Sequence, residues 1–475
     1  MYSRKTPRSP RNNRFDTVTE PFLQQSGLPF AEVLTSATIE RAFAQHDGLF
    51  AEDDIFSTPI VLWAFLAQVL RGGKGAACAA AVADIATYRE QTGGGVPSGD
   101  TGDYCRARSK LDLAALRELV VEAAQHLEEH AASAWLWHGR HAKLVDGFTF
   151  TMPDTPANQE EFPQQKNQRP GVGFPIARAC AVLSLATAAI HDLNIGPYEG
   201  KETGESALLR EILDGLKPGD VAVFDRYFCS FMMLALLRLG GVHYCTRLHQ
   251  RRPIDFRQGR RLGQNDRLIT WTRPKRPSWM SAELYEQIPE TMMLRELRFQ
   301  VTVPGRRTET LVVVTSLTDP VAYPKEDIAE LYGYRWNAEL DIRDIKQTLG
   351  LDQVRCKTPH MVRRELWVTL LGYNLVRKLI ATAAAVHAKQ PRQLGFTLAC
   401  QTILSSWMLL AAGACRDERT LWRLALKRIA ANEVANRPGR IEPRMLKRRR
   451  QRYPLMHDPR QKLQQALLAP QRPRR

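Results

Sequence analysis

The stretch YPKEDIAELYGYRWNAELDIRDIKQTLG, residues Tyr323–Gly350, decides the fold of this chain. Pro324 opens the stretch, and proline suits the first turn of a helix because its missing N–H has no partner there. Gly350 closes it, as glycine often does just past a helix C-terminus. Between these limits apolar residues recur at helical spacing, namely Ile328, Leu331, Ala338, Ile342, Ile345 and Leu349. The pattern therefore predicts one continuous helix with a buried face.

Four other residues of this stretch share a second stripe of the expected helix. Arg335, Glu339 and Lys346 follow Tyr332 by three, seven and fourteen residues. On a helix these positions lie within roughly 60° of one another. The stripe is either an ordinary solvated edge with an Arg–Glu pair or one wall of an active site. The helix alone does not decide between the two readings.

Composition restricts the class of protein. The chain has 475 residues, 44% of them hydrophobic, which is typical of a globular protein long enough for several domains. Its 67 Lys and Arg residues exceed its 50 Asp and Glu residues, which gives a formal net charge of +17. Because much of this charge lies in the termini and in Arg-rich segments, the expected partner is nucleic acid and not a membrane surface.

The expected location is the bacterial cytoplasm, in association with the nucleoid. The basic N-terminus is followed by no apolar run and so does not resemble a secretory signal. The eight cysteines show no zinc-binding spacing, and we expect them to be reduced and mostly buried. The uncharged segment 393–415 is long enough to span a bilayer. Its Gln and Ser residues favour a buried helix instead.

Changes in pattern along the chain predict a mixed α/β catalytic core that is interrupted by a β-rich insertion and flanked by helical regions. The expected regions are a disordered basic arm (1–20), a helical N-terminal DNA-binding domain (21–140), the first part of the core (141–246), the β-rich insertion (247–312), the second part of the core with the Tyr323–Gly350 helix (313–385), a C-terminal helical region (386–436) and a basic tail (437–475).

Two of these regions allow more than one function. The N-terminal helices and their Gly-rich turn suit either a DNA reader of helix-turn-helix type or a plain bundle that packs on the core. The insertion interleaves arginines with Trp271 and Trp279. This pattern suits phosphate contact with base stacking, or a solvated β-ribbon whose tryptophans form its own small core.

Three carboxylates on separate predicted elements suggest a site for divalent metal ions. Asp146 lies within the strand-like KLVDGFTFT, Asp225 ends the apolar VAVFD, and Glu339 lies on the charged stripe. Strand ends and a packed helix can bring three carboxylates together, and such a group is stable only when cations occupy it. Oxygen ligands select Mg²⁺ or Mn²⁺. Two such ions about 4 Å apart suit phosphodiester cleavage and transfer.

These residues resemble a known family. YGYRWNAELDIRDIK matches Tyr-x2-Arg-x3-Glu-x6-Lys at every spacing, the signature of bacterial insertion-sequence transposases of the DDE class, insertion-sequence-four type. LVDGFTFTMPDTPAN and VAVFDRYFCS resemble the first- and second-aspartate segments of that family. The resemblance covers roughly residues 55–460. It implies an RNase H-like core with a β-strand insertion before the catalytic glutamate.

The resemblance also implies roles for single residues. Asp146, Asp225 and Glu339 would bind two divalent ions as the catalytic triad. Tyr332, Arg335 and Lys346 would contact phosphates or a flipped nucleotide near the transposon end, and one tryptophan of the insertion would stack the flipped base. Trp271 and Trp279 are both candidates, and Arg226 is either a DNA contact or an ordinary surface residue.

The expected activity is cut-and-paste transposition by a homodimer that binds double-stranded DNA, both transposon ends and target. Two alternatives remain open at this point. One is a metal-dependent nuclease of the same fold that cleaves without strand transfer. The other is an inactive DNA-binding protein derived from a transposase.

Overall fold

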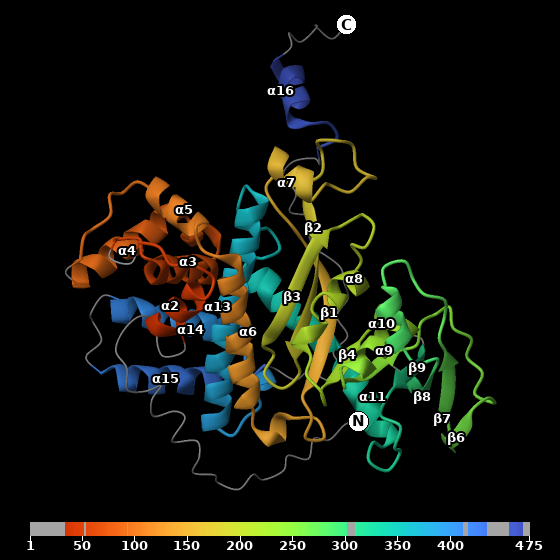
Figure 1. Ribbon diagram of the computed structural model, residues 1–475. Coiled ribbons are helices and arrows are strands. Elements are labelled where there is room, and N and C mark those ends of the chain that lie inside the picture. Colours follow the sequence, from red (N-terminus) through yellow and green to blue (C-terminus); the bar gives the residue numbers. More distant parts are fainter. Residues whose placement is uncertain are drawn as a thin grey trace, which may run out of the picture.

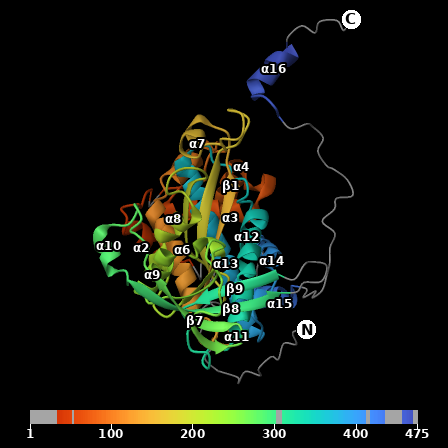
Figure 2. The same cartoon turned by 90° about the vertical axis from the view of Figure 1, so that its right-hand side faces the viewer.

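The computed structural model describes residues 34–51, 54–92, 94–301, 309–411, 417–434 and 456–468. Figure 1 shows helices at one side, a large sheet in the middle and a strand-rich extension at the opposite end. The predicted basic arm (1–20) and most of the predicted tail (437–475) lie outside the described residues. Within the tail, helix α16 (Arg460–Leu468) lies apart from the other elements in both views (Figure 2).

The N-terminal part is a bundle organised around helix α3. Its members are α2 (Ser36–Ala44), α3 (Thr58–Arg71), α4 (Cys78–Thr92), α5 (Gly102–Ser109) and α6 (Leu113–Glu129). Helix α3 is apolar on nearly every side and is therefore buried against its neighbours and against the long helix α13 (Pro359–Val386). Helices α14 (Phe396–Ala411) and α15 (Glu418–Ala431) complete this side of the molecule (Figure 1).

A mixed nine-stranded sheet forms the centre, as the alternation of strands and helices predicted. Its order is β3-β2-β1-β4-β5-β9-β8-β7-β6. The first five strands in the chain are β1 (Ala142–Thr151), β2 (Ile176–Ser184), β3 (Ile190–Pro197), β4 (Val221–Phe224) and β5 (His243–Arg247). Strand β1 pairs antiparallel with β2 and parallel with β4, and β5 continues parallel to β4.

The insertion extends this same sheet. Its strands are β6 (Arg260–Gly263), β7 (Asp266–Thr272), β8 (Thr291–Val301) and β9 (Glu309–Thr315), with the short helix α10 (Ala282–Gln287) between β7 and β8. Strands β8 and β9 pair antiparallel. Strand β9 then pairs with core strand β5, Cys245 opposite Thr315, so the insertion and the core share one continuous hydrogen-bonded sheet.

Two cores cover the two faces of the sheet. On β1, Leu144 and Phe148 face a core shared with α3, α6 and α13. Val145 faces the other core, shared with α8 (Glu205–Arg210) and α9 (Phe231–Leu239). Because side chains alternate along a strand, Asp146 belongs to the face of Leu144. The remaining helix, α7 (Pro156–Glu161), follows β1.

The predicted continuous helix at Tyr323–Gly350 is wrong in one respect. It consists of α11 (Lys325–Gly333), α12 (Trp336–Arg343) and a π-helical turn, Asp344–Thr348. At the break, Arg335 N donates to Tyr332 O at 3.1 Å and Ala338 N donates to Arg335 O at 3.0 Å. These bonds span three residues instead of four, so the helix tightens at the start of the charged stripe.

A buried ion-pair network fastens α12 to α13. Asp341 is 3% exposed and accepts hydrogen bonds from Arg377 at 3.2 Å and from Arg392 at 2.8 Å. Arg377 also donates to Asp344 at 3.1 Å and to the Tyr373 hydroxyl at 2.9 Å. Buried charges are tolerated only when they are paired and hydrogen-bonded, and each charge here has several partners.

The uncharged segment 393–415 contains α14, which has 16 residues and packs against α13 and α15. Among the described residues, no helix has both the length and the apolar character that a membrane span requires.

Asp341→Asn tests the network. Because the substitution removes the charge that balances Arg377 and Arg392, it is expected to lower stability by on the order of 3 kcal/mol, measured as a fall in the denaturation midpoint. Asp103→Asn is the control, since Asp103 pairs with Arg106 on the surface and such pairs contribute about 0–1 kcal/mol. Equal small effects of both substitutions would contradict a structural role for the network.

A second buried network predicts the response to acid. Glu128 contacts Lys143 and His191 beneath the sheet. Burial opposes ionisation of Glu128, but hydrogen bonds from His141 and His191 and the charge of Lys143 hold its pKa far below the usual 4.5. Burial also lowers the pKa of His191 from 6.5.

Both groups bind protons less readily in the folded chain than in the unfolded chain. Their contribution to stability is therefore complete above about pH 6.5, and it is lost progressively as pH falls, most steeply below about pH 4.5. Glu128→Gln is expected to lower the melting temperature at neutral pH, and its difference from wild type is expected to narrow between about pH 5 and pH 3. Thermal denaturation of both proteins across this pH range tests the prediction. A difference in melting temperature that does not change with pH would contradict it.

Candidate active site

Strand register places two of the predicted carboxylates side by side. In the parallel pairing of β1 with β4, Leu144 lies opposite Val223. Asp146 and Asp225 each follow two residues later, Asp225 just beyond the end of β4. The two carboxylates are close enough for the charge of Asp225 to raise the pKa of Asp146. Leu144 and Val223 belong to the same core, and alternation puts Asp146 and Asp225 on that same face. Asp225 lies directly after the last residue of β4, where its carboxylate accepts a hydrogen bond from Tyr227 N at 2.7 Å.

The catalytic helix supplies the third carboxylate and a cation. Helix α12 packs against β1 and carries Glu339, whose side chain is 38% exposed. Arg335 lies between the two elements. Its guanidinium donates to Glu339 Oε1 at 3.0 Å and lies 3.7 Å from Asp146 Oδ2. The predicted Arg–Glu pair therefore exists, and it points toward the aspartates of the sheet.

The electrostatics of this group favour added positive charge. Burial is the main cause that raises the pKa of Asp146 to about 6. The charge of Arg335 and a hydrogen bond from Gly147 N lower it, and the nearby charges of Glu339 and Asp225 raise it. A carboxyl group with this pKa lies where its own negative charge is destabilised. Such shifts are common at functional sites.

The other two residues of the stripe lie at its two ends. Tyr332 is partly buried, and burial raises its pKa to about 12. Lys346 lies in the π-helical turn, where its Nζ donates to Thr149 O at 2.9 Å and pairs with Asp352 at 2.9 Å. Lys346 therefore ties the end of the helix to β1.

The two tryptophans of the insertion that were predicted as candidates for base stacking are Trp271 and Trp279, and they are buried to different degrees. Trp271 is 5% exposed within the core shared by α8 and α9, and the guanidinium of Arg252 lies 3.4 Å from its ring centroid. In this structure the Trp271 ring is not accessible for base stacking, because β7 directs it into the core. Trp279 is partly buried beneath Arg210, 3.9 Å away. Both rings therefore pack against the core that this face of the sheet shares with α8 and α9, and not in a separate core of the insertion.

Exposed residues flank the second aspartate and the helix break. Arg226 and Tyr227 directly follow Asp225, and both are exposed. Trp336 directly follows Arg335 and is 53% exposed. The predictions from sequence did not single out either exposed aromatic ring, although each is adjacent in sequence to a predicted site residue.

Glu205 is a further carboxylate that the sequence analysis missed. It begins α8 on the opposite face of β1, where burial raises its pKa and the charge of Asp225 adds to the effect. A Cβ atom on Gly147 would lie 2.2 Å from Glu205 Cδ. Glycine is unfavourable within a strand, so its position directly after Asp146 was a readable signal that another group approaches the backbone.

The chemistry of the three carboxylates suits hard divalent cations, although the three side chains do not lie close enough together to share one ion. Among the described residues, no group of three His, Cys, Asp or Glu side chains is close enough to hold a metal ion. Glu339 is instead engaged by Arg335. The donor set of two strand-borne aspartates and one partly exposed glutamate nevertheless consists of oxygens alone, as Mg²⁺ and Mn²⁺ prefer.

Comparisons with known proteins identify the family of this chain. The family described as transposase DDE domain matches residues 137–375, a segment that contains Asp146, Asp225 and Glu339. Transposase InsG for insertion sequence element IS4 of Escherichia coli (strain K12) is 27% identical over 354 residues, which cover 74% of this chain and 77% of that protein. The putative transposase InsZ of the same organism is 26% identical over 143 residues, 29% of this chain and 45% of that protein.

Among solved structures, the cryo-EM structure of the piggyBac transposase synaptic complex with hairpin DNA aligns with 90% of this chain and 88% of that chain, at a TM-score of 0.43 and 10% identity. The family match spans about half of the chain and includes the whole candidate site. The chain therefore belongs to the DDE transposase family, as an insertion-sequence transposase of IS4 type that cleaves and transfers DNA strands.

Proposed function

We propose that Asp146, Asp225 and Glu339 are the catalytic carboxylates and that together they hold two divalent ions, Mg²⁺ or Mn²⁺. The observation that carries the proposal is the parallel register of β1 and β4, which sets the two aspartates level beneath α12. When bound, the ions would supply Lewis-acid stabilisation of the attacking and leaving oxygens of a phosphodiester. The raised pKa of Asp146 supports the proposal, because burial disfavours its charged form and the nearby carboxylates Glu339 and Asp225 add to that effect.

The core is best interpreted as RNase H-like. Three antiparallel strands, β3-β2-β1, continue into β4 and β5, which run parallel to β1. Carboxylates on β1, after β4 and on a helix beyond the insertion follow the arrangement that the family resemblance implies. The insertion then enters between β5 and the catalytic helix as an extension of the sheet.

Arg335 has two roles in this proposal. Without DNA, its guanidinium neutralises Glu339 and partly neutralises Asp146. A phosphate of the substrate offers the same planar cation a bidentate partner, which would release Glu339 toward the aspartates. Tyr332, Lys346 and Arg226 would contact neighbouring phosphates or a flipped nucleotide.

The two candidates in the insertion for stacking a flipped base are Trp271 and Trp279, and they differ in accessibility. Trp279 remains a candidate, whereas Trp271 is buried. Tyr227 and Trp336 present exposed rings beside Asp225 and Arg335, and we include both among the residues proposed to stack a flipped base.

The chain is proposed to act as a homodimer on double-stranded DNA, at transposon ends and target, within the bacterial nucleoid. A nuclease of the same fold would yield cut ends alone, and an inactive DNA-binding relative would yield none. Incubation of end-containing duplex with Mg²⁺ separates these activities, because hairpin ends or joined target products arise only through strand transfer. Their absence from an active preparation would contradict transposition.

Glu339→Gln tests the catalytic assignment. Loss of one charged oxygen ligand is expected to lower cleavage of end-containing DNA by at least about a hundredfold, while affinity for the same DNA in EDTA changes little. Gel analysis of products and a binding titration measure the two quantities.

Glu330→Gln is the matched control on the same helical stretch. Glu330 accepts a hydrogen bond from Tyr334 at 2.7 Å, and glutamine can still accept that bond. Cleavage by this control is expected to equal wild type. Full cleavage by the Glu339 variant would remove Glu339 from the catalytic set.

Gly147→Ala tests whether the close approach of Glu205 positions Asp146. The new Cβ cannot fit against the Glu205 side chain as it lies. If Glu205 holds its place, β1 must shift beside Asp146, and cleavage is then expected to fall by roughly tenfold to a hundredfold because a shift of about 1 Å at reacting groups has that effect. The double variant Gly147→Ala/Glu205→Ala restores the space and is expected to recover part of the loss.

Gly196→Ala on β3 is the control, because its Cβ would lie 3.2 Å from the flexible end of Leu208. Cleavage assays under identical conditions compare the variants. Wild-type activity of Gly147→Ala would show that Glu205 does not constrain the site.

A further inference from the structure

A groove with several cations in a largely apolar lining lies between the catalytic helix and the N-terminal bundle. One cavity of about 840 Å³ lies between helices α3 to α5 and the segment that follows the π-helical turn. A second cavity of about 660 Å³ lies beside the end of β1 and includes Lys346. The two share Gly350, Val354 and Arg355, so together they form one groove along this segment.

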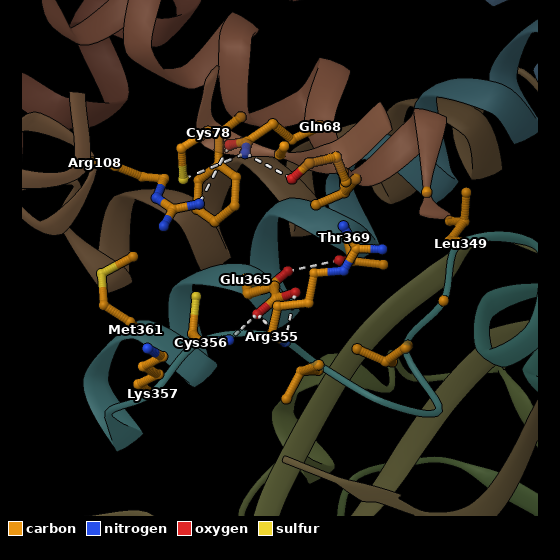
Figure 3. A pocket seen from close by; sticks show the side chains of 18 of the residues that line it. Gln68, Cys78, Arg108, Leu349, Arg355, Cys356, Lys357, Met361, Glu365 and Thr369 are labelled. Carbon is orange, nitrogen blue, oxygen red and sulfur yellow. Dashed lines mark hydrogen bonds between the residues drawn. The ribbon is translucent and has the colours of Figure 1, made fainter. Parts of the chain in front are cut away.

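Three cations line the groove from both sides. Arg108 comes from α5, and Arg355 and Lys357 come from the segment after the catalytic helix. Figure 3 shows Arg108 on the side of the N-terminal helices, with Arg355 and Lys357 on the opposite side. Within the part of the chain that the structure describes, none of these three cations forms an ion pair.

Arg108 is held in place without a counter-charge. Its guanidinium lies 4.6 Å from the centroid of the Phe65 ring and donates to Gln68 Oε1 at 3.3 Å. Its buried Nε has no hydrogen-bond partner in the structure. A half-buried guanidinium with an unused donor suits an anionic ligand, because leaving a buried donor unsatisfied costs about 1–3 kcal/mol.

The carboxylates of the groove are already engaged. Glu365 accepts hydrogen bonds from the backbone N–H groups of Arg355, at 2.9 Å and 3.1 Å, and of Cys356, at 2.9 Å. Asp352 pairs with Lys346. Glu365 therefore fixes the backbone of the segment, and Arg355 and Lys357 remain exposed on either side of the buried Cys356.

We propose that this groove binds the sugar–phosphate backbone of duplex DNA where it leaves the active site, with Arg108, Arg355 and Lys357 as phosphate contacts. The inference rests on the proposed function, because it needs DNA at the catalytic helix. The groove begins beside Lys346 and leads toward the N-terminal bundle, so a duplex that lies in it contacts both parts of the chain. Phosphate contacts of this kind fix register and contribute salt-dependent affinity.

The test is the salt dependence of binding to an end-containing duplex, measured in EDTA so that no cleavage occurs. Each lost phosphate contact is expected to reduce the slope of log K against log salt by about 0.9. Arg355→Ala and Lys357→Ala are therefore each expected to flatten the slope by about 1, and the double variant by about 2. Arg108→Gln is a third variant, and Arg355 and Lys357 suffice for the test if it fails to fold.

Lys427→Ala is the control. Lys427 is exposed on α15 and does not line the groove. The C-terminal end of α15 contacts the segment after α13, where Lys389 Nζ donates to Ala430 O. Its slope is expected to equal that of wild type. Wild-type slopes for both groove variants would overturn the inference, whereas failure of the wild-type chain to bind or cleave the duplex would overturn the proposed function instead.

Inorganic phosphate separates DNA from a small anion as the occupant. A phosphate-dependent rise in melting temperature that disappears in Arg355→Ala, together with unchanged slopes for DNA, would identify a small-anion pocket and overturn the proposal. Flattened slopes with ethylation interference at one or two phosphates, lost in the variants, would support it.

Discussion

The buried contact of Asp341 with Arg377 and Arg392 is the interaction on which the proposed active site depends. Two residues along a helix differ by about 200° around its axis, so fixing Asp341 against α13 turns Glu339 toward β1. The sheet fixes Asp146 and Asp225 through backbone hydrogen bonds, but the helix has no such ladder. Its rotation is determined by side chains, and the ion pairs of Asp341 and Asp344 contribute to that constraint.

Arg335 links this constraint to chemistry. It occupies the space between Glu339 and Asp146, where it reduces the repulsion among carboxylates that the fold brings together. Burial nevertheless raises the pKa of Asp146 despite the charge of Arg335. The local tightening of the helix at Arg335 places this cation one turn ahead of Glu339, so the irregularity in the helix serves the same arrangement.

Much of this arrangement was predictable because it depends on periodic patterns. The spacing of Tyr332, Arg335 and Glu339 and the position of Asp225 at a strand end are local features, and the structure places Glu339 over the face that carries both aspartates. The break in the helix was not predictable, since a switch from four-residue to three-residue hydrogen bonds leaves no mark in apolar spacing.

Other features depend on contacts between distant segments. The burial of Trp271 follows from the pairing of β7 with β8 and of β9 with β5, which one sequence does not specify. Glu205 reaches Gly147 only after α8 packs on the sheet. The groove also depends on contacts between distant segments. Arg108 and Arg355 are far apart in sequence and line the same groove only because α5 and the segment after the catalytic helix lie together.

The most direct measurement is the anomalous diffraction of Mn²⁺ in crystals of the protein with end-containing duplex. Two peaks bounded by Asp146, Asp225 and Glu339 are expected, with Arg335 turned from Glu339 to a phosphate. Manganese bound elsewhere, or an intact Arg335–Glu339 pair in a complex that still cleaves on warming, would contradict this account.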